Sequence, residues 1–346
     1  MDAKTMTMRA TARRLAGWRS GARKLGLWAL ALTMAATSVL LVAGQVAKAR
    51  TLAPHQPLGE LVDIGGYRLH LYCQGSGGPT VILEAGGGET LLDWALTQPV
   101  IARQARVCAY DRAGLGWSDP SPRPRTAAAM ADELHTLLHR AGIAGPYVLV
   151  GHSLGGPLVR QFALAHPQDV VGMVLVDSST EQQGARFPAA YRKAMAGAPR
   201  MLRLVSLAAD AGLLALFPGV FPPLTQLPPD AAGGIQALAI SSGKMFRTTR
   251  AELIAAEADP TPRPATLGDV PLVVLRRDPD AVPVPSQITP EAAQQFETTW
   301  AQMQEELAAL SPRGRVILAE GSGHGIMLDR PDLVISAVQD VLAATR

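Results

Sequence analysis

A serine between glycines is the first place in this sequence where the residue types could do chemistry. Ser153 lies in the run Gly151-His152-Ser153-Leu154-Gly155, directly after four apolar residues and directly before a helical pattern. A buried strand that enters a helix through Gly-x-Ser-x-Gly is typical of a nucleophile elbow, with the serine hydroxyl exposed at the strand tip. The glycines are required because the tight turn leaves no room for a Cβ. Ser153 is therefore the predicted nucleophile.

A serine hydroxyl is a weak nucleophile at neutral pH and needs a general base. Most of the seven histidines lie in predicted helices, in the first hairpin or in the linker before it. His152 lies inside the elbow, where its side chain should point away from the hydroxyl. His324 lies in a glycine-flanked loop after a predicted strand, and loops after parallel strands gather on the sheet edge where Ser153 is expected. His324 is therefore the predicted base.

The base needs a carboxylate that holds its tautomer and stabilises its cation. Two aspartates follow predicted strands, Asp177 directly after Val176 and Asp278 shortly after Leu275. We prefer Asp278, because it gives the chain order nucleophile, acid, base with the acid after the penultimate strand. Asp177 is the alternative acid, and Asp280 is a near neighbour that could substitute.

The tetrahedral intermediate of acyl transfer also needs hydrogen-bond donors for its oxyanion. The N–H of Leu154, at the start of the helix, is one predicted donor. The N–H of Gly87 is the second, because a glycine run directly after a strand lets the backbone approach a ligand closely. Loss of one such donor typically costs about 10²–10³ in rate.

Strands alternate with helices along most of the chain, which predicts an α/β fold with a mostly parallel sheet covered on both faces. Strands are predicted at 60–64, 67–72, 80–84, 106–110, 147–150, 171–176, 271–275 and 315–320. Helices are predicted at 91–105, 126–141, 157–166, 291–310 and 331–344.

The region 180–269 differs in composition from the rest. It is rich in Ala, Leu, Pro and Met, and its prolines break it into short helices. Its length exceeds that of one ordinary crossover between strands. We predict a helical lid here, inserted into a core made of residues 59–179 and 270–346.

The N-terminal residues are predicted to cross a membrane. Residues 1–24 form a basic tail with seven Lys or Arg and one Asp, and residues 25–47 are 23 uncharged residues. As a helix this run is about 34 Å long, against a hydrocarbon core of about 30 Å. The basic cluster predicts a single-pass anchor in the cell membrane, with the tail cytoplasmic and the domain beyond the linker 48–58 extracytoplasmic. The alternative is a secretory signal cleaved near Ala49, which would give a secreted or periplasmic protein.

Charge and cysteine content argue against other classes of site. Outside the tail the chain carries 25 Lys or Arg against 28 Asp or Glu, so no nucleic-acid-binding face is expected. Cys73 and Cys108 fit no zinc spacing. His135 and His139 lie four residues apart but lack the glutamate and third ligand of a metal motif. Neither a metal nor another cofactor is predicted.

Three motifs, each after a predicted strand, make the chain similar to the α/β-hydrolase superfamily from Leu58 to the C-terminus, apart from the region 180–269. The resemblance implies an eight-stranded sheet, a Ser-Asp-His triad and a lid between the sixth and seventh strands. Because position 153 is Ser and not Asp, it disfavours haloalkane dehalogenases and epoxide hydrolases. The motifs are Gly151-His152-Ser153-Leu154-Gly155, Asp111-Arg112-Ala113-Gly114-Leu115-Gly116-Trp117-Ser118 and Gly321-Ser322-Gly323-His324.

In the fold that this resemblance implies, the second and fourth strands are neighbours. Cys73 and Cys108 lie near strand ends that would meet, so a disulfide and two buried free thiols are the two alternatives. Asp111 and Arg112, after the fourth strand, are interpreted as a structural ion pair that braces the loops around the site, with a catalytic role as the alternative.

These residues predict a membrane-anchored, carboxylesterase-like serine hydrolase. Ser153 attacks an ester or related acyl carbon, His324 transfers the proton, Asp278 orients His324, and water releases the acyl group. The apolar lid favours a small or hydrophobic acyl substrate. The alternative is a non-catalytic, hydrolase-like protein that binds a small apolar ligand beneath the lid.

Overall fold

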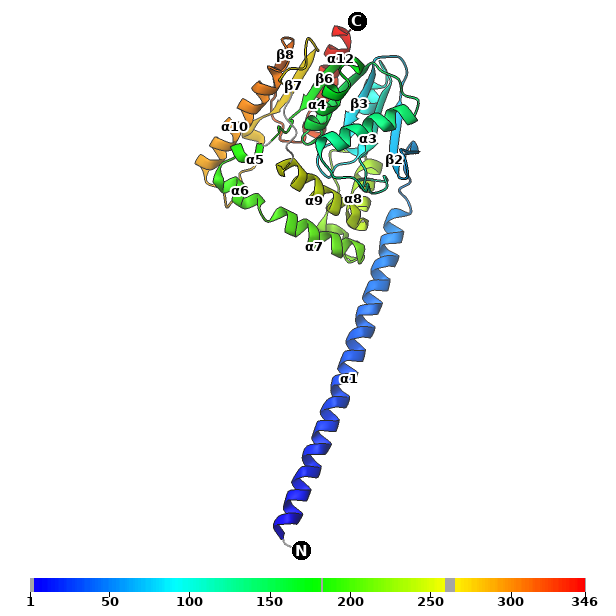
Figure 1. The fold of residues 1–346 in the computed structure, drawn as a ribbon, viewed down its shortest axis with the longest axis vertical. Coiled ribbons are helices and arrows are strands. Elements are labelled where there is room, and N and C mark those ends of the chain that lie inside the picture. Colours follow the sequence, from blue (N-terminus) through cyan, green and yellow to red (C-terminus); the bar gives the residue numbers. More distant parts are fainter. Residues whose placement is uncertain (1–2, 182, 259–264, 346) are drawn as a thin grey trace.

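The structure, a computed structural model, describes residues 3–181, 183–258 and 265–345, with side chains from Arg23 onward. Figure 1 shows a globular α/β body from which one long N-terminal helix projects. The body holds the sheet and its covering helices, and the C-terminus lies on the side of the body opposite to that helix.

Eight strands form one sheet in the order β1-β2-β4-β3-β5-β6-β7-β8. Strand β2 pairs antiparallel with β1 and β4, and the pairs from β4 to β8 are parallel, which confirms the predicted mostly parallel eight-stranded sheet. The strands are β1 Glu60–Asp63, β2 Arg68–Gln74, β3 Thr80–Glu84, β4 Val107–Asp111, β5 Tyr147–His152, β6 Val170–Val176, β7 Leu272–Arg277 and β8 Gly314–Ala319.

Helices cover both faces of the sheet because successive strand residues point to opposite faces. In β3, Val81 and Leu83 enter one apolar cluster, and Ile82 between them enters the other. The first cluster is completed by α12, and the second by α3, α4 and α10. These helices are α3 Ala127–Arg140, α4 Gly155–Ala165, α10 Pro290–Ala308 and α12 Pro331–Ala344.

The prediction of one continuous helix over 91–105 is wrong. The segment forms a 3₁₀ turn, η1 Leu91–Trp94, and one α-helical turn, α2 Gln98–Ile101. Thr90 caps the first turn, and Pro99 opens the second. Proline has no N–H to donate and disfavours a helical conformation in the residue before it, so one helix cannot continue through this position.

The segment between β6 and β7 is helical. Helices α7 and α9 pack against each other, and α9 contacts the core through Glu252. Part of the predicted lid, residues 182 and 259–264, lies outside the described residues. The elements are α5 Gln183–Arg186, α6 Ala189–Met195, α7 Ala198–Asp210, η3 Leu214–Leu216, η4 Pro218–Val220, α8 Pro229–Ser241 and α9 Gly243–Ala258.

The projecting helix is α1, Ala3–Leu52. Within the described part of the chain, its segment Arg23–Leu52 is the one helix long and apolar enough to cross a membrane, and none of its most apolar window is buried in the protein. Helix α1 continues through the first residues of the predicted linker and ends beside α8 and η3. An exposed apolar helix of this length is compatible with a membrane anchor.

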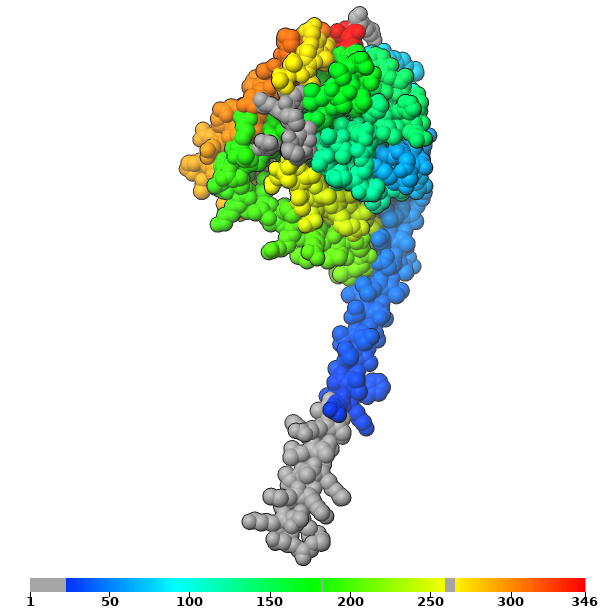
Figure 2. Space-filling model, in the orientation of Figure 1, coloured from blue at the N-terminus to red at the C-terminus, as the bar shows by residue number. Residues whose placement is uncertain are grey.

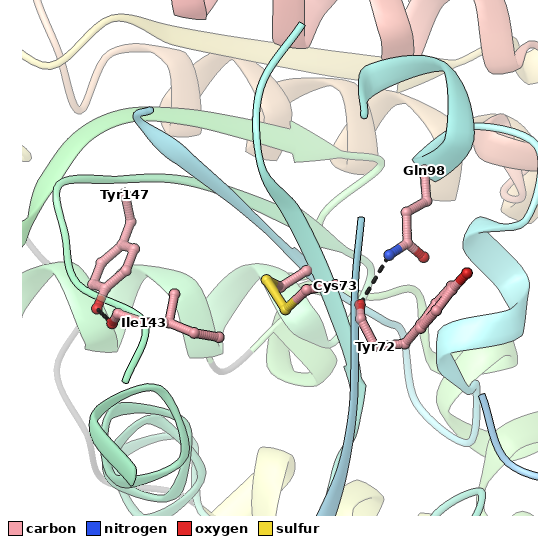
Figure 3. Close-up of a disulfide and its surroundings, with 6 residues drawn as sticks. Tyr72, Cys73, Gln98, Ile143 and Tyr147 are labelled. Atoms are coloured by element: carbon pink, nitrogen blue, oxygen red, sulfur yellow. Dashed lines mark hydrogen bonds between the residues drawn. A yellow bond between two sulfur atoms is a disulfide. The ribbon is translucent and has the colours of Figure 1, made fainter. Parts of the chain in front are cut away.

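Cys73 on β2 and Cys108 on β4 form a disulfide. The two residues are directly opposite each other in the antiparallel pairing of these strands. Figure 3 shows the bridge beside Tyr72, whose carbonyl accepts a hydrogen bond from Nε2 of Gln98 at 2.9 Å. Of the two alternatives for the cysteines, the structure contains the disulfide.

Candidate active site

Ser153 lies in the turn between β5 and α4. Its φ of 49° is one of two positive values among the described non-glycine residues, and such a conformation costs of order 1–3 kcal/mol. The flanking glycines make the turn possible. A Cβ at Gly151 would lie 2.8 Å from the carbonyl oxygen of Gly155, and a Cβ at Gly155 would lie 2.6 Å from that of Glu84. The sharp turn leaves the serine side chain only partly buried.

The structure brings His324 to Ser153. Nε2 of His324 lies 2.9 Å from Oγ of Ser153, and Nδ1 of His324 lies 2.6 Å from Oδ2 of Asp177. Asp177 is fully buried, while the side chain of His324 is 46% exposed. The three residues form a hydrogen-bonded series from a buried carboxylate to a hydroxyl that solvent can reach. With the imidazole neutral, Nδ1–H donates to the carboxylate and Nε2 can accept the serine proton.

The buried carboxylate of Asp177 has four donors. In addition to His324, it accepts from the N–H and Nη1 of Arg277, each at 3.1 Å, and from Nε1 of Trp300 at 2.7 Å. Burial alone would raise the pKa of Asp177, but the hydrogen bond from His324 and the charge of Arg277 outweigh it and lower that pKa. Asp177 is therefore held as a carboxylate.

The preference for Asp278 as the partner of the base is corrected by this geometry. Asp278 lies at the N-terminus of the 3₁₀ turn η5, Pro279–Ala281, where it accepts from the N–H of Asp280 at 3.1 Å and of Gly321 at 2.9 Å. These backbone hydrogen bonds lower the pKa of Asp278 without involving His324. Asp280 contributes its N–H to this turn and not a carboxylate to the histidine.

The two predicted oxyanion donors are adjacent. A Cβ at Gly87 would lie 3.5 Å from Cδ2 of Leu154. Within the described residues, neither of their N–H groups donates a hydrogen bond to another backbone carbonyl. The roles of these donors remain predictions, and the geometry leaves both N–H groups free to bind an anion beside Ser153.

Sequence reasoning missed a second histidine at the site. Nδ1 of His152 lies 2.8 Å from Oε2 of Glu89, and Nε2 lies 2.9 Å from the carbonyl oxygen of His324. Oε2 of Glu89 also accepts from the N–H of Gly86 at 2.6 Å. The pair therefore ties the glycine loop that carries Gly87 to the loop that carries His324. Its sequence signal was a histidine inside the elbow and a glutamate just after the glycine run.

Asp111 and Arg112 do not pair with each other, contrary to the prediction. Arg112 is buried and bonds Glu84 of β3 at 2.7 Å and Glu252 of α9 at 2.8 Å. It also donates to the carbonyls of Ala85 and Gly86 at 2.5 and 2.7 Å. Arg112 therefore braces the glycine loop against the sheet and against the helices between β6 and β7. Asp111 instead faces Nδ1 of His70 at 2.8 Å.

One group of described side chains could hold a metal ion, and it lies outside the Ser153 site. The ligand atoms of His135, His166 and Asp169 lie within 4.8 Å of one another. The two imidazoles are stacked, with ring centroids 3.8 Å apart and planes 7° from parallel. Stacked rings at this spacing account for the cluster as packing between α3 and the end of α4.

The family model for the alpha/beta hydrolase fold matches residues 79–248. An AB hydrolase superfamily protein of Gibberella zeae is 26% identical over 288 residues, covering 78% of this chain and 87% of that protein. A protein of Hormonema carpetanum that is described as the probable transporter efuK is 40% identical over 136 residues, but the match spans 37% of this chain and only 20% of that protein. A thermophilic esterase from Thermogutta terrifontis has a TM-score of 0.55 at 21% identity, covering 81% of this chain and 94% of the esterase.

These comparisons agree with the architecture. The residues that the family model matches run from β3 through the serine turn after β5 into α9. At 21% identity the esterase contributes evidence on the fold alone. The chain has the α/β-hydrolase fold, and the family model that matches its central part supports its membership of the α/β-hydrolase superfamily.

Proposed function

We propose that this hydrolase is a serine esterase that cleaves an ester or related acyl bond through Ser153, His324 and Asp177. The observation that carries the proposal is the unbroken series of hydrogen bonds from Asp177 through His324 to Ser153, at 2.6 and 2.9 Å. A serine, a base and an orienting carboxylate within these distances are what acyl transfer by an activated hydroxyl requires.

In the first step, Oγ of Ser153 attacks the acyl carbon while Nε2 of His324 takes the hydroxyl proton. The negative charge that develops on the acyl oxygen is stabilised by the N–H groups of Leu154 and Gly87. Asp177 stabilises the imidazolium, which then protonates the leaving alcohol as the C–O bond breaks. Water then attacks the acyl-enzyme while His324 takes its proton. His324 returns the proton to Oγ of Ser153 as the ester bond to the serine breaks, which releases the carboxylic acid and the free serine.

The test is covalent labelling of the full chain with a fluorophosphonate, together with turnover of short p-nitrophenyl esters. We expect the wild type to label, and Ser153→Ala to abolish labelling and reduce turnover on the order of 10⁶-fold, because the nucleophile is lost. Ser286→Ala, at an exposed serine in the loop before α10, is the matched control and should retain both labelling and turnover. A folded wild type that does not label would favour the binding-protein alternative, which a ligand-dependent rise in melting temperature without product would support.

We also propose that α1 anchors the protein in the cell membrane with the domain outside the cytoplasm. The basic residues before Leu25, the apolar exposed helix and the disulfide between Cys73 and Cys108 support this orientation. In cells that express the full chain, stripped of wall and outer membrane but with the cell membrane sealed, added protease should digest the domain and leave an N-terminal fragment in the membrane after alkaline extraction. Full protection of the domain in sealed cells, or its release by alkaline extraction, would refute the anchor in this orientation.

A further inference from the structure

Large apolar side chains are exposed on α7 and beside η4, in the segment between β6 and β7. In α7 they recur every three residues, so that they share one face of the helix, while Ser206 and Ala209 on the opposite side are buried. Two more follow around η4. We call the five together the docking face: Met201, Leu204, Leu207, Phe217 and Val220, which are 58%, 63%, 58%, 65% and 57% exposed.

The docking face is fixed to α1. Gly44 of α1 contacts the backbone of Gly212 so closely that a Cβ at Gly44 would lie 2.8 Å from the carbonyl oxygen of Ala211. Nε2 of Gln45 donates to the carbonyl oxygen of Asp210, the last residue of α7, at 2.8 Å. Figures 1 and 2 show α7 at the margin of the body from which α1 projects.

The contact at Gly44 places the docking face at a defined height on α1. From Leu25 to Ala43 every residue of α1 is exposed, and this stretch is about 28 Å long as a helix. The hydrocarbon core of a bilayer is about 30 Å thick. If this stretch spans the core, Gly44 and Gly212 lie at its outer boundary, and the neighbouring docking face lies at the level of the lipid headgroups.

The charges around the docking face are mainly positive. Residues 183–241 contain five Lys or Arg and two Asp. Arg200 and Arg203 are exposed on α7 itself. A cavity of about 640 Å³ between the end of α1 and the body is lined by Lys48 and Lys244, and by Arg247, which is paired with Asp210. Cations at headgroup height attract anionic lipids.

We propose that the docking face lies in the headgroup layer of an anionic bilayer and forms a second membrane contact beside α1. The inference rests on the proposed membrane anchorage and does not depend on the esterase activity. Apolar residues on one face, flanking cations and a fixed height on a spanning helix are together the features of a surface that lies in the interface. A second copy of this chain is the competing partner for the same face.

The test uses the full chain with single cysteines that carry an environment-sensitive fluorophore. The two native cysteines are joined in a disulfide, so an introduced cysteine is the free thiol. Leu204→Cys reports on the docking face, Val39→Cys on the spanning helix, and Ser336→Cys, exposed on α12 at the opposite side of the body, is the matched control. The labelled proteins are reconstituted into vesicles of phosphatidylcholine and phosphatidylglycerol that contain a lipid quencher with a shallow nitroxide.

We expect the quencher to lower the fluorescence at positions 204 and 39 at least about twofold and to leave position 336 unchanged. Quenching at 204 should weaken when phosphatidylglycerol is replaced by phosphatidylcholine, or in Arg200→Gln/Arg203→Gln. Quenching at 39 without quenching at 204 overturns the proposal. So does disulfide crosslinking between two Leu204→Cys chains without lipid quenching, which identifies a second copy as the partner. Absence of quenching at 39 overturns the anchorage and this inference with it, whereas fluorophosphonate labelling still reports on the esterase.

Discussion

Two histidine–carboxylate pairs lie side by side at the end of the sheet, with the rings of His324 and His152 4.8 Å apart. Their carboxylate distances are similar, 2.6 Å to Asp177 and 2.8 Å to Glu89. They differ in what faces the second ring nitrogen. For His324 it is the hydroxyl of Ser153, which can donate a proton, and for His152 it is the carbonyl of His324, which can only accept.

This single difference in hydrogen-bond partner separates the proposed base, His324, from His152, whose partners favour a cation. His324 can keep a lone pair toward the serine, whereas His152 satisfies both of its partners only if both ring nitrogens carry a proton. Burial would lower the pKa of His152, but the charge and hydrogen bond of Glu89 outweigh it and raise that pKa. Burial would likewise raise the pKa of Glu89, and His152 lowers it. The shifts of both partners therefore favour an imidazolium–carboxylate pair beside the proposed base.

The largest effect is expected when the pair of His324 and Asp177 is disrupted. Asp177→Asn should reduce turnover of p-nitrophenyl esters about 10⁴-fold, because an amide no longer holds the imidazole in the reactive tautomer. The measurement is kcat for the full chain, with substrate binding followed separately through KM.

Asp278→Asn is the matched control, since Asp278 caps a surface turn and touches neither His324 nor Ser153. It should retain kcat within a factor of about two. If instead Asp278→Asn loses activity and Asp177→Asn retains it, the hydrogen-bonded series from Asp177 through His324 to Ser153 does not carry out the reaction.

Asp177 and Asp278 show how much of the candidate site could be predicted from the sequence. The meeting of Ser153 and His324 could be predicted, because each lies in a short glycine-flanked motif whose turn is determined locally. The acid could not, because β6 and β7 both end at the same sheet edge and each is followed by an aspartate. The choice depends on β7 continuing through Arg277 in register with Ala319 of β8, which places Asp278 in the following turn.

Long-range contacts account for the other omissions. The mostly parallel sheet could be predicted from the alternation of strands and helices, because each apolar strand has a pattern that is visible in its own residues. The partners of His152 and Arg112 could not be predicted from local patterns. Glu89 lies 63 residues from His152 in the chain, and Glu252 lies 140 residues from Arg112. Asp177 did carry a local signal, as an aspartate directly after a buried strand, and its φ of 40° shows a tight turn like that of Ser153.

A smaller effect is expected when the pair of His152 and Glu89 is disrupted. Glu89→Gln keeps an acceptor for His152 but removes the charge that stabilises the imidazolium and weakens the tie to the glycine loop. We expect kcat to fall about 10- to 100-fold with labelling retained, because the donors for the oxyanion are less well positioned. Nitrogen NMR of the histidines should show both nitrogens of His152 protonated at neutral pH in the wild type and a titrating ring in the variant.

Glu291→Gln, at an exposed position in the first turn of α10, controls for the loss of one negative charge and should leave kcat and the spectrum unchanged. A neutral His152 in the wild type at neutral pH would show that the two pairs do not differ in the way that their partners indicate.

The smallest effect is on the pH dependence of stability. Because the pKa of Glu89 is lowered, its contribution is complete above about pH 4.3, the unfolded value, and is lost as the pH falls through the folded value. Because the pKa of His152 is raised, its contribution is complete below about pH 6.5 and is lost as the pH rises through the folded value. The free energy of unfolding of the wild type should therefore exceed that of Glu89→Gln by about 1–2 kcal/mol between these limits, and by less on either side. Denaturant titration of the full chain in detergent across this range measures the difference, and a difference independent of pH would mean that the pair is not ionised in the folded protein.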